Sequence, residues 1–379
     1  MKRTSFLRLK FVVKLRLSAA FLLSTVVGLI RIWFRENRLN RSRMGEIALR
    51  ASINGYRESI LLYIAAKLGL ADLLVKGPRD SDELALLVGA HAPSLYRVLR
   101  GLVVLGLISE KQDGRFALTA LGTWLLSDKR NSLRNSALLC GEGRYVVFGS
   151  LLKSVMTGKS AWTDLDTNFF DYSRKHPELD TIYNTAMRRH SKRIAQSVLA
   201  AYDFHSLNSV ADIGGGHGGL LAAILKAYPT HTGILFDQPH VTDNALPYLE
   251  KAGVAERCRI VGGDFLNHIP TGANVLILKN ILHNWDDERC ITILRNCREA
   301  LAQGGKILVI EGLMPARAED NPGMIWLDLW MLAQMGGGER TEKRYREFLA
   351  EAGFAFTRAL PIASQLWVIE AVYDNGTEP

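Results

Sequence analysis

The pattern of apolar and polar residues divides the chain into a helical N-terminal part and a C-terminal part in which strands and helices alternate. Between residues 56 and 126, apolar residues recur with helical spacing in ESILLYIAAKLGLADLL and in APSLYRVLRGLVVLGLI. Asp80 and Ser81 are N-cap candidates for a helix between these two. Asp113-Gly114, in SEKQDGRFALT, predicts a hairpin turn. Three helices followed by a hairpin are the winged-helix pattern.

From residue 206 onward, short apolar runs typical of buried strands alternate with helical segments. The run VADI ends in three glycines, Gly214 to Gly216, and LLAAILKAYP follows before the strand GILFD ends on Asp237. Strand, glycine turn, helix, strand and acid form the first unit of a nucleotide-binding α/β domain. Asp237 is placed to accept hydrogen bonds from both hydroxyls of a ribose.

Two cofactors fit this unit. Gly214, Gly216 and Gly219 satisfy the G-x-G-x-x-G pattern of NAD-binding domains. S-adenosylmethionine has no pyrophosphate and has less use for an anion-binding helix N-terminus. Its sulfonium and amino groups are cationic and favour a nearby acid, which Asp212 supplies. The glycine loop alone therefore favours S-adenosylmethionine and leaves NAD as a competitor.

Six motifs follow one another along the chain: the triple glycine, FDQPHV, GGDF, an LK…H-x-W-x-D-E run, VIEGLMP and GGGERT. In this order they resemble the class I S-adenosylmethionine-dependent O-methyltransferases of the plant caffeate and hydroxyindole type and their bacterial natural-product relatives. The resemblance extends from about Gly55 to Val372. It implies an α/β fold, with a Rossmann-like methyltransferase domain preceded by a mostly helical winged-helix dimerisation domain. The predicted parts are a basic apolar leader (1–43), the dimerisation domain (44–135), a helical linker and substrate-pocket region (136–205) and the methyltransferase domain (206–375).

The resemblance also implies roles for single residues. His283 falls on the family's catalytic base, Glu311 and Glu339 fall on the two carboxylates that flank it, and Met187 resembles a substrate-clamping methionine. Asp264 and Phe265 would meet the adenine, Trp285 would stack on it, and Lys279 would lie beside the cofactor. Together with the acid expected near the sulfonium, the predicted cofactor-binding residues are Asp212, Gly214, Gly216, Asp237, Asp264, Phe265, Lys279 and Trp285. Trp285 and Met187 are also explained as ordinary core residues.

The chemistry of methyl transfer asks for the same residue types. A phenol with a pKa near 10 keeps its proton at neutral pH, so a base must remove it as the oxygen attacks. A histidine suits that role, and a carboxylate on its other ring nitrogen would fix the tautomer. Glu311 and Glu339 lie 28 and 56 positions after His283. Both spacings are compatible with convergence at the carboxyl edge of a parallel sheet.

Several features limit the range of functions. The four cysteines (Cys140, Cys258, Cys290 and Cys297) show no metal-ligand spacing, so we expect a metal-free site and a reducing compartment. Arg97 and Arg100 are the only basic residues on the would-be recognition helix, too few for a phosphate backbone, so we expect no nucleic-acid partner. The family commonly has Asp after the catalytic His, whereas this chain has Asn284. This departure leaves room for altered activity.

The net charge of +9 comes from the leader. Residues 1–43 contain 11 Lys and Arg and a single acid, and the rest of the chain has a net charge of −1. The uncharged stretch Leu17–Ile30 is shorter than the ~20 residues of a membrane-spanning helix, and no A-x-A cleavage site follows it. Three interpretations stay open: a start codon placed upstream of the true one at Met44, a helix in peripheral contact with a membrane, and an export signal.

The sequence therefore predicts a homodimeric, S-adenosylmethionine-dependent O-methyltransferase that methylates a hydroxyl of a small aromatic or polyketide-like metabolite. We expect it in the cytoplasm, with membrane association if the leader binds lipid. Three alternatives remain: a cofactor-binding relative that decarboxylates or hydroxylates, a non-enzymatic winged-helix regulator, and an NAD oxidoreductase. The acceptor, and transfer to oxygen as against nitrogen or carbon, cannot be read from the sequence.

Overall fold

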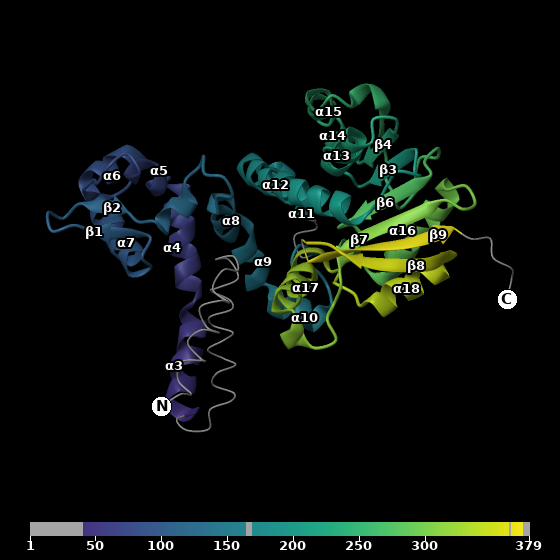
Figure 1. Ribbon diagram of the computed structural model, residues 1–379. Coiled ribbons are helices and arrows are strands. Elements are labelled where there is room, and N and C mark those ends of the chain that lie inside the picture. The colour runs from purple at the N-terminus through teal and green to yellow at the C-terminus, as the bar shows by residue number, and fades with distance from the viewer. Residues whose placement is uncertain (1–40, 164–168, 364, 374–379) are drawn as a thin grey trace, which may run out of the picture. The chain divides into compact units, whose positions relative to one another are not determined.

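The computed structural model describes residues 41–163, 169–363 and 365–373 (Figure 1). The predictions for the leader therefore fall almost entirely outside the described residues. Within the described ranges, no helix is both long enough and apolar enough to cross a membrane. The chain forms two compact units that divide between Ser132 and Leu133, and each is described by itself.

The first unit is mostly helical and ends in a small hairpin. Its elements are α3 (Arg41–Asn54), α4 (Tyr56–Lys67), α5 (Leu70–Leu74), α6 (Ser81–Val88), α7 (Ala92–Val104), β1 (Ile108–Glu110), β2 (Phe116–Leu118) and η2 (Gly122–Leu125). Asp80 caps α6 in a capping box with Glu83. Gly114 takes a positive φ of 78° in the turn between the antiparallel β1 and β2. The predicted helices and hairpin are present.

One predicted helix of this unit is divided. The stretch ESILLYIAAKLGLADLL was expected to form a single helix, but α4 ends at Lys67 and α5 begins at Leu70. Gly69 lies between them with a left-handed φ of 63°, a conformation that glycine adopts without steric cost. The prediction of one continuous helix was wrong because the apolar pattern continues across this turn.

The second unit begins with helices and continues as an alternation of strands and helices. The first part comprises α8 (Arg134–Leu139), η3 (Cys140–Arg144), α9 (Tyr145–Gly149), α10 (Leu151–Thr157), α11 (Phe169–Lys175) and α12 (Pro177–Ala201). The second comprises β3 (Ser209–Ile213), α13 (Gly219–Ala227), β4 (Thr232–Asp237), α14 (Pro239–Thr242), α15 (Leu246–Ala252), η5 (Ala255–Arg257), β5 (Cys258–Gly262), β6 (Val275–Lys279), η6 (Leu282–Asn284), α16 (Asp287–Ala300), β7 (Lys306–Gly312), η7 (Ala318–Asp320), α17 (Pro322–Met335), α18 (Glu342–Glu351), β8 (Phe354–Pro361) and β9 (Leu366–Tyr373).

The strands of this unit form one sheet in the order β5-β4-β3-β6-β7-β9-β8. The first five run parallel, whereas β9 is antiparallel to both β7 and β8. Because β3 pairs with both β4 and β6, the direction of winding reverses between β3 and β6, and open α/β sheets place ligands at such a reversal. This is the predicted Rossmann-like fold.

Two apolar clusters cover the two faces of the sheet. Ala211 and Ile213 of β3 face the cluster that includes residues of α16 and α18, whereas Val210 faces the cluster that includes residues of α12 and α13 (Figure 1). Strands covered on both faces become continuously apolar, as VLIL of β6 is before Lys279 ends the strand. The polar residues at the carboxyl ends of these strands break this apolar pattern, which makes them candidates for a functional site.

Candidate active site

The glycine loop follows β3 and is braced by Asp237 at the end of β4. Gly214 and Gly216 have positive φ angles of 68° and 61°, which residues with a Cβ rarely adopt. The backbone N–H of Gly216 donates to Asp237 Oδ2 at 2.8 Å, and the N–H of Gln238 donates to Asp237 Oδ1 at 2.7 Å. The predicted ribose-binding carboxylate therefore also holds the loop in shape.

Asp212 lies beneath this loop and is fully buried. Among the described residues, no group makes a hydrogen bond to either of its carboxylate oxygens. Burial raises the pKa of Asp212 to about 6, with the negative charge of Asp237 adding to the rise and the positive charge of Lys279 opposing it. A Cβ on Gly215 would lie 2.7 Å from Asp212 Cγ, so the loop can rest on the carboxylate only as glycine. A buried, unpaired carboxylate is suited to a cationic ligand group.

This burial predicts that Asp212→Asn stabilises the ligand-free protein. The folded-state pKa of about 6 is above the ordinary aspartate value of 3.8, so the ionised form costs stability at pH 8, up to about 3 kcal/mol. The neutral amide removes that cost. Thermal unfolding at pH 8 should show a higher Tm for the variant. The difference in Tm between the variant and the wild type should shrink between pH 6 and pH 4, where wild-type Asp212 becomes protonated. A variant with a lower Tm than the wild type at pH 8 would contradict the account.

The residues predicted to meet the adenine gather at the ends of β5 and β6. The rings of Phe265 and Trp285 meet edge to face, with centroids 5.9 Å apart. Asp264 Oδ1 accepts from the N–H of Leu266 at 2.9 Å, and Asp264 Oδ2 accepts from Asn267 at 3.1 Å. The carboxylate thus also folds its own loop.

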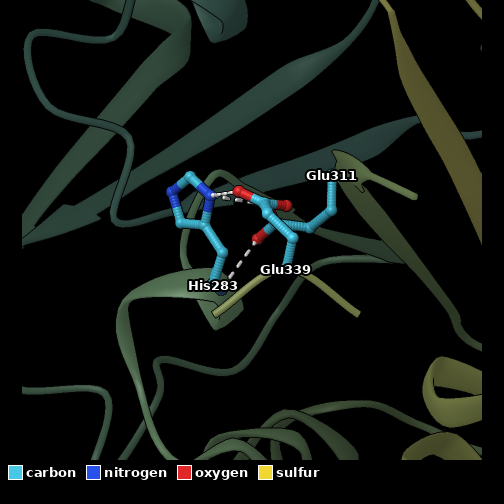
Figure 2. A group of neighbouring side chains, drawn as sticks. All are labelled: His283, Glu311 and Glu339. Atoms are coloured by element: carbon cyan, nitrogen blue, oxygen red, sulfur yellow. Dashed lines mark hydrogen bonds and ion pairs between the residues drawn. The ribbon is translucent and has the colours of Figure 1, made fainter. Parts of the chain in front are cut away.

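His283, Glu311 and Glu339 converge in a buried group at the carboxyl edge of the sheet (Figure 2). His283 Nδ1 lies 2.8 Å from Glu339 Oε1 and 3.5 Å from Glu311 Oε2. Since a carboxylate accepts, Nδ1 carries the proton that it donates to Glu339. Nε2 points away from both carboxylates, as Figure 2 shows, and in this tautomer carries a free lone pair. Residues 28 and 56 positions apart in the sequence thus form one site.

The two glutamates bind different parts of the histidine loop. Glu311 Oε1 accepts from the backbone N–H groups of Ile281 at 2.8 Å, Leu282 at 2.9 Å and His283 at 3.5 Å. It therefore holds the backbone of the loop that carries the histidine, whereas Glu339 holds the imidazole ring. Sequence reasoning had given both carboxylates to the ring, because no backbone contact can be read from residue spacing.

The carboxylates also set the charge of the histidine. Burial alone would lower the pKa of His283, but the negative charges of Glu311 and Glu339 outweigh burial and raise it. Burial raises the pKa of Glu311, against the attraction of His283. The two carboxylates therefore stabilise the protonated, imidazolium form of His283.

A metal ion would find three donors here. One ligand atom each of His283, Glu311 and Glu339 lies within 4.8 Å of the others, and this is the one such group found among the described residues. However, Nδ1 and Glu339 Oε1 are already joined by a hydrogen bond, and Glu311 Oε1 is engaged by backbone N–H groups. The metal-free site stays a prediction.

Asn284, the departure from the family pattern, does not cap the next helix. Asp286 is the N-cap of α16 and accepts from the N–H of Arg289. Asn284 Nδ2 instead donates to the backbone oxygen of Asn280 at 3.2 Å, and Asn280 has a left-handed φ of 54°. The amide therefore ties together the two ends of the loop that carries His283.

This contact predicts that Asn284→Asp destabilises the protein. Aspartate has no N–H to donate and would place a carboxylate against a carbonyl oxygen. We expect the free energy of unfolding to fall by about 1 kcal/mol, measured by urea denaturation with cofactor absent. Asn284→Ala, which loses the bond without adding charge, is the control and should lose less. An aspartate variant as stable as the wild type would show that this hydrogen bond does not form in solution.

Gly337 allows the loop that carries Glu339 to approach the loop that carries His283. A Cβ at Gly337 would lie 2.3 Å from the His283 backbone oxygen, which no side chain permits. Gly338 N donates to the same oxygen at 3.0 Å. The glycines of GGGERT therefore serve this close contact.

The other predicted residues take less definite places. Lys279 ends β6 and Met187 lies on α12, both half-buried. Trp162 and Phe169 are buried and pack against Tyr172 and Tyr183, with centroids 4.6 Å apart for Trp162–Tyr172 and 4.7 Å for Phe169–Tyr183. The same cluster includes Val147 of α9 and Ala333 of α17.

Comparison with known proteins assigns the family. Residues 148–355 match the model of the O-methyltransferase domain, and residues 51–128 match the O-methyltransferase dimerisation domain. The chain belongs to the O-methyltransferase family. The phenazine O-methyltransferase PhzM of Lysobacter antibioticus is 44% identical over 336 residues, which cover 88% of this chain and 98% of that protein.

Solved structures agree with the assignment to this O-methyltransferase family. The mitomycin 7-O-methyltransferase MmcR superposes with a TM-score of 0.82 at 33% identity, covering 87% of this chain and 98% of the other. An O-methyltransferase of neocarzinostatin biosynthesis, solved with S-adenosylmethionine and a naphthoic acid, has a TM-score of 0.75 at 34% identity and covers 83% and 96%. This O-methyltransferase is an enzyme whose cofactor is S-adenosylmethionine, and the NAD and regulator alternatives were wrong.

Proposed function

We propose that this O-methyltransferase methylates a hydroxyl of a small aromatic metabolite, with His283 as the general base. The observation that carries the proposal is the buried His283–Glu339 hydrogen bond, which leaves Nε2 with a free lone pair and directs it away from both carboxylates. The glycine loop, together with Asp212, Asp237 and Asp264, would form the cofactor site at the same edge of the sheet.

The cofactor fits the residues that are present. Asp212, buried and unpaired, would bind the cationic methionine end, and Gly214 and Gly216 would lie against it. Asp237 would accept from the ribose hydroxyls. Asp264, Phe265 and Trp285 would surround the adenine, with Lys279 beside it. When bound there, S-adenosylmethionine would supply an electrophilic methyl carbon, with a neutral sulfide as the leaving group.

The protein's own residues supply the proton chemistry. His283 Nε2 accepts the proton of the acceptor hydroxyl as the oxygen's lone pair forms the new bond to carbon. Glu339 keeps the proton on Nδ1 and neutralises the resulting imidazolium, and Glu311 keeps the loop backbone in place. General-base help of this kind contributes about 10²- to 10⁴-fold, and holding the two reactants in line contributes further.

The acceptor class rests on the relatives and on the aromatic residues of the second unit. The relatives named above are a phenazine, a mitomycin and a neocarzinostatin-pathway enzyme, the last bound to a naphthoic acid. Met187 and the cluster around Trp162 and Tyr172 would present a flat apolar surface to such a ring.

We further propose that the dimerisation domain joins two copies of the chain.

Turnover on phenolic acceptors tests this function. Release of S-adenosylhomocysteine, in amounts equal to the methylated product, is expected with at least one member of a panel of hydroxylated phenazines, naphthoates and quinones. Binding of S-adenosylhomocysteine without methylation of any acceptor would favour the decarboxylase or hydroxylase alternative.

A further inference from the structure

Arg340, directly after Glu339, has all five of its guanidinium N–H groups engaged. Nε and Nη2 donate to Asp287 Oδ1 at 3.0 and 2.8 Å. Nη1 donates to the backbone oxygens of Leu282 at 3.2 Å and Gly338 at 2.9 Å, and Nη2 donates to that of Trp285 at 2.7 Å. These are as many bonds as a guanidinium has N–H groups. The side chain is only 9% exposed, so the bonds are shielded from water.

The three carbonyls belong to the two chain segments that meet in the active site. Leu282 and Trp285 enclose His283 in the loop after β6, whereas Gly338 precedes Glu339 in the loop after α17. One rigid cation therefore joins the backbone on both sides of the histidine to the backbone beside its glutamate.

We propose that Arg340 is a positioning residue, whose guanidinium fixes the distance between His283 Nδ1 and Glu339 by holding both loops. The inference rests on the proposed role of His283 as the base. Arg340 acts through these two side chains and not on the reacting atoms. Its ion-pair partner is Asp287.

Arg344 provides a matched control from the next turn of chain. It donates to Asp287 Oδ2 through Nε at 3.1 Å and Nη2 at 2.7 Å, and its Nη1 donates to Glu347. Both guanidinium groups lie over the ring of Phe348, at 5.1 Å for Arg340 and 4.5 Å for Arg344. No hydrogen bond of the described residues joins Arg344 to the three loop carbonyls. The two arginines thus share the ion pair and the aromatic contact, whereas only Arg340 makes the carbonyl contacts and is buried, at 9% exposure against 40% for Arg344.

The test compares Arg340→Met with Arg344→Met in the full-length protein. For Arg340→Met we expect kcat to fall about 10- to 100-fold, the cost of displacing a catalytic group by about 1 Å. For Arg344→Met we expect a change within about fivefold, as for a partly exposed ion pair. Arg340→Lys keeps the charge but offers donors from a single point, so it should resemble Arg340→Met in kcat. Recovery of wild-type kcat in the lysine variant would overturn the proposal.

The protonation of His283 gives a second readout that needs no turnover. Looser contact with Glu311 and Glu339 should bring the raised pKa of His283 down toward its ordinary value. The ¹³Cε1 resonance of His283, assigned with His283→Ala, should then titrate at lower pH in Arg340→Met and unchanged in Arg344→Met. Equal titration in both variants would overturn the proposal. If Arg340→Met does not fold, as judged by circular dichroism, Arg340→Lys carries both comparisons.

These readouts separate two failures. Wild-type turnover in His283→Ala would overturn the proposed base and leave the titration as a valid test of Arg340. Normal turnover and titration in Arg340→Met, with an inactive His283→Ala, would overturn the positioning role alone.

Discussion

Replacing His283 with alanine will lower kcat for a phenolic acceptor by about 10²- to 10⁴-fold, the usual contribution of a general base. The affinity for S-adenosylhomocysteine should change little, because the hydrogen bond of the imidazole goes to Glu339 and no hydrogen bond among the described residues joins it to the glycine loop. The measurements are steady-state turnover and calorimetric titration of the same samples. Loss of cofactor binding together with activity would indicate that the variant has lost its fold.

Glu339→Gln is a milder substitution at the same site, to be compared with His283→Ala. Glutamine keeps the shape, but its neutral amide does not stabilise an imidazolium. We expect a smaller loss of kcat than for His283→Ala. The acid limb of the pH profile should also move to lower pH, because one of the charges that raise the pKa of His283 is gone. An acid limb that stays in place would contradict the assignment of that limb to His283.

Replacing Asp237 with alanine will weaken the binding of S-adenosylhomocysteine about 100-fold or more. Two hydrogen bonds from ribose hydroxyls to an ionised carboxylate contribute about 1.5–3 kcal/mol each, and each 1.4 kcal/mol is a factor of ten in the dissociation constant. The substitution also removes the acceptor of the Gly216 N–H, so the loop loses its brace. Calorimetric titration of the ligand-free variant gives the constant directly.

Asp237→Asn is the matched control, because it separates the loss of the carboxylate charge from the loss of the acceptor that braces the glycine loop. The amide retains one oxygen that can accept from Gly216 but loses the charge, so its affinity should lie between those of the wild type and Asp237→Ala. If both variants bind as tightly as the wild type, Asp237 does not contact the ribose, and its role is confined to bracing the loop.

Much of the site could be predicted because its residues lie at the ends of strands. His283, Glu311 and Asp237 each follow or end an apolar run, and parallel strands bring such ends to one edge. Glu339 was predicted from a motif in a loop, and the structure places it 2.8 Å from His283 Nδ1. The sequence predicts which residues belong to the site because the apolar pattern of each strand shows which residues lie at the carboxyl edge of the sheet.

The division of labour within the site could not be predicted, because it depends on backbone atoms. Glu311 holds N–H groups and Arg340 holds carbonyls, and every residue carries both groups, so no residue type marks these partners. The burial of Asp212 depends on the contact made by Gly215. The break at Gly69 was missed because glycine also occurs inside helices, and the apolar pattern does not show that this glycine takes a left-handed φ of 63°.

The central claim, that His283 removes the acceptor's proton, is tested most directly by varying the acidity of the acceptor. The measurement is the ratio of wild-type to His283→Ala kcat for a series of one phenolic acceptor whose ring substituents lower the hydroxyl pKa from about 10 to below the assay pH. An acceptor that is already ionised needs no base. The account predicts a ratio of about 10²–10⁴ for the least acidic member that falls toward unity for the most acidic. A ratio that stays constant across the series would contradict it.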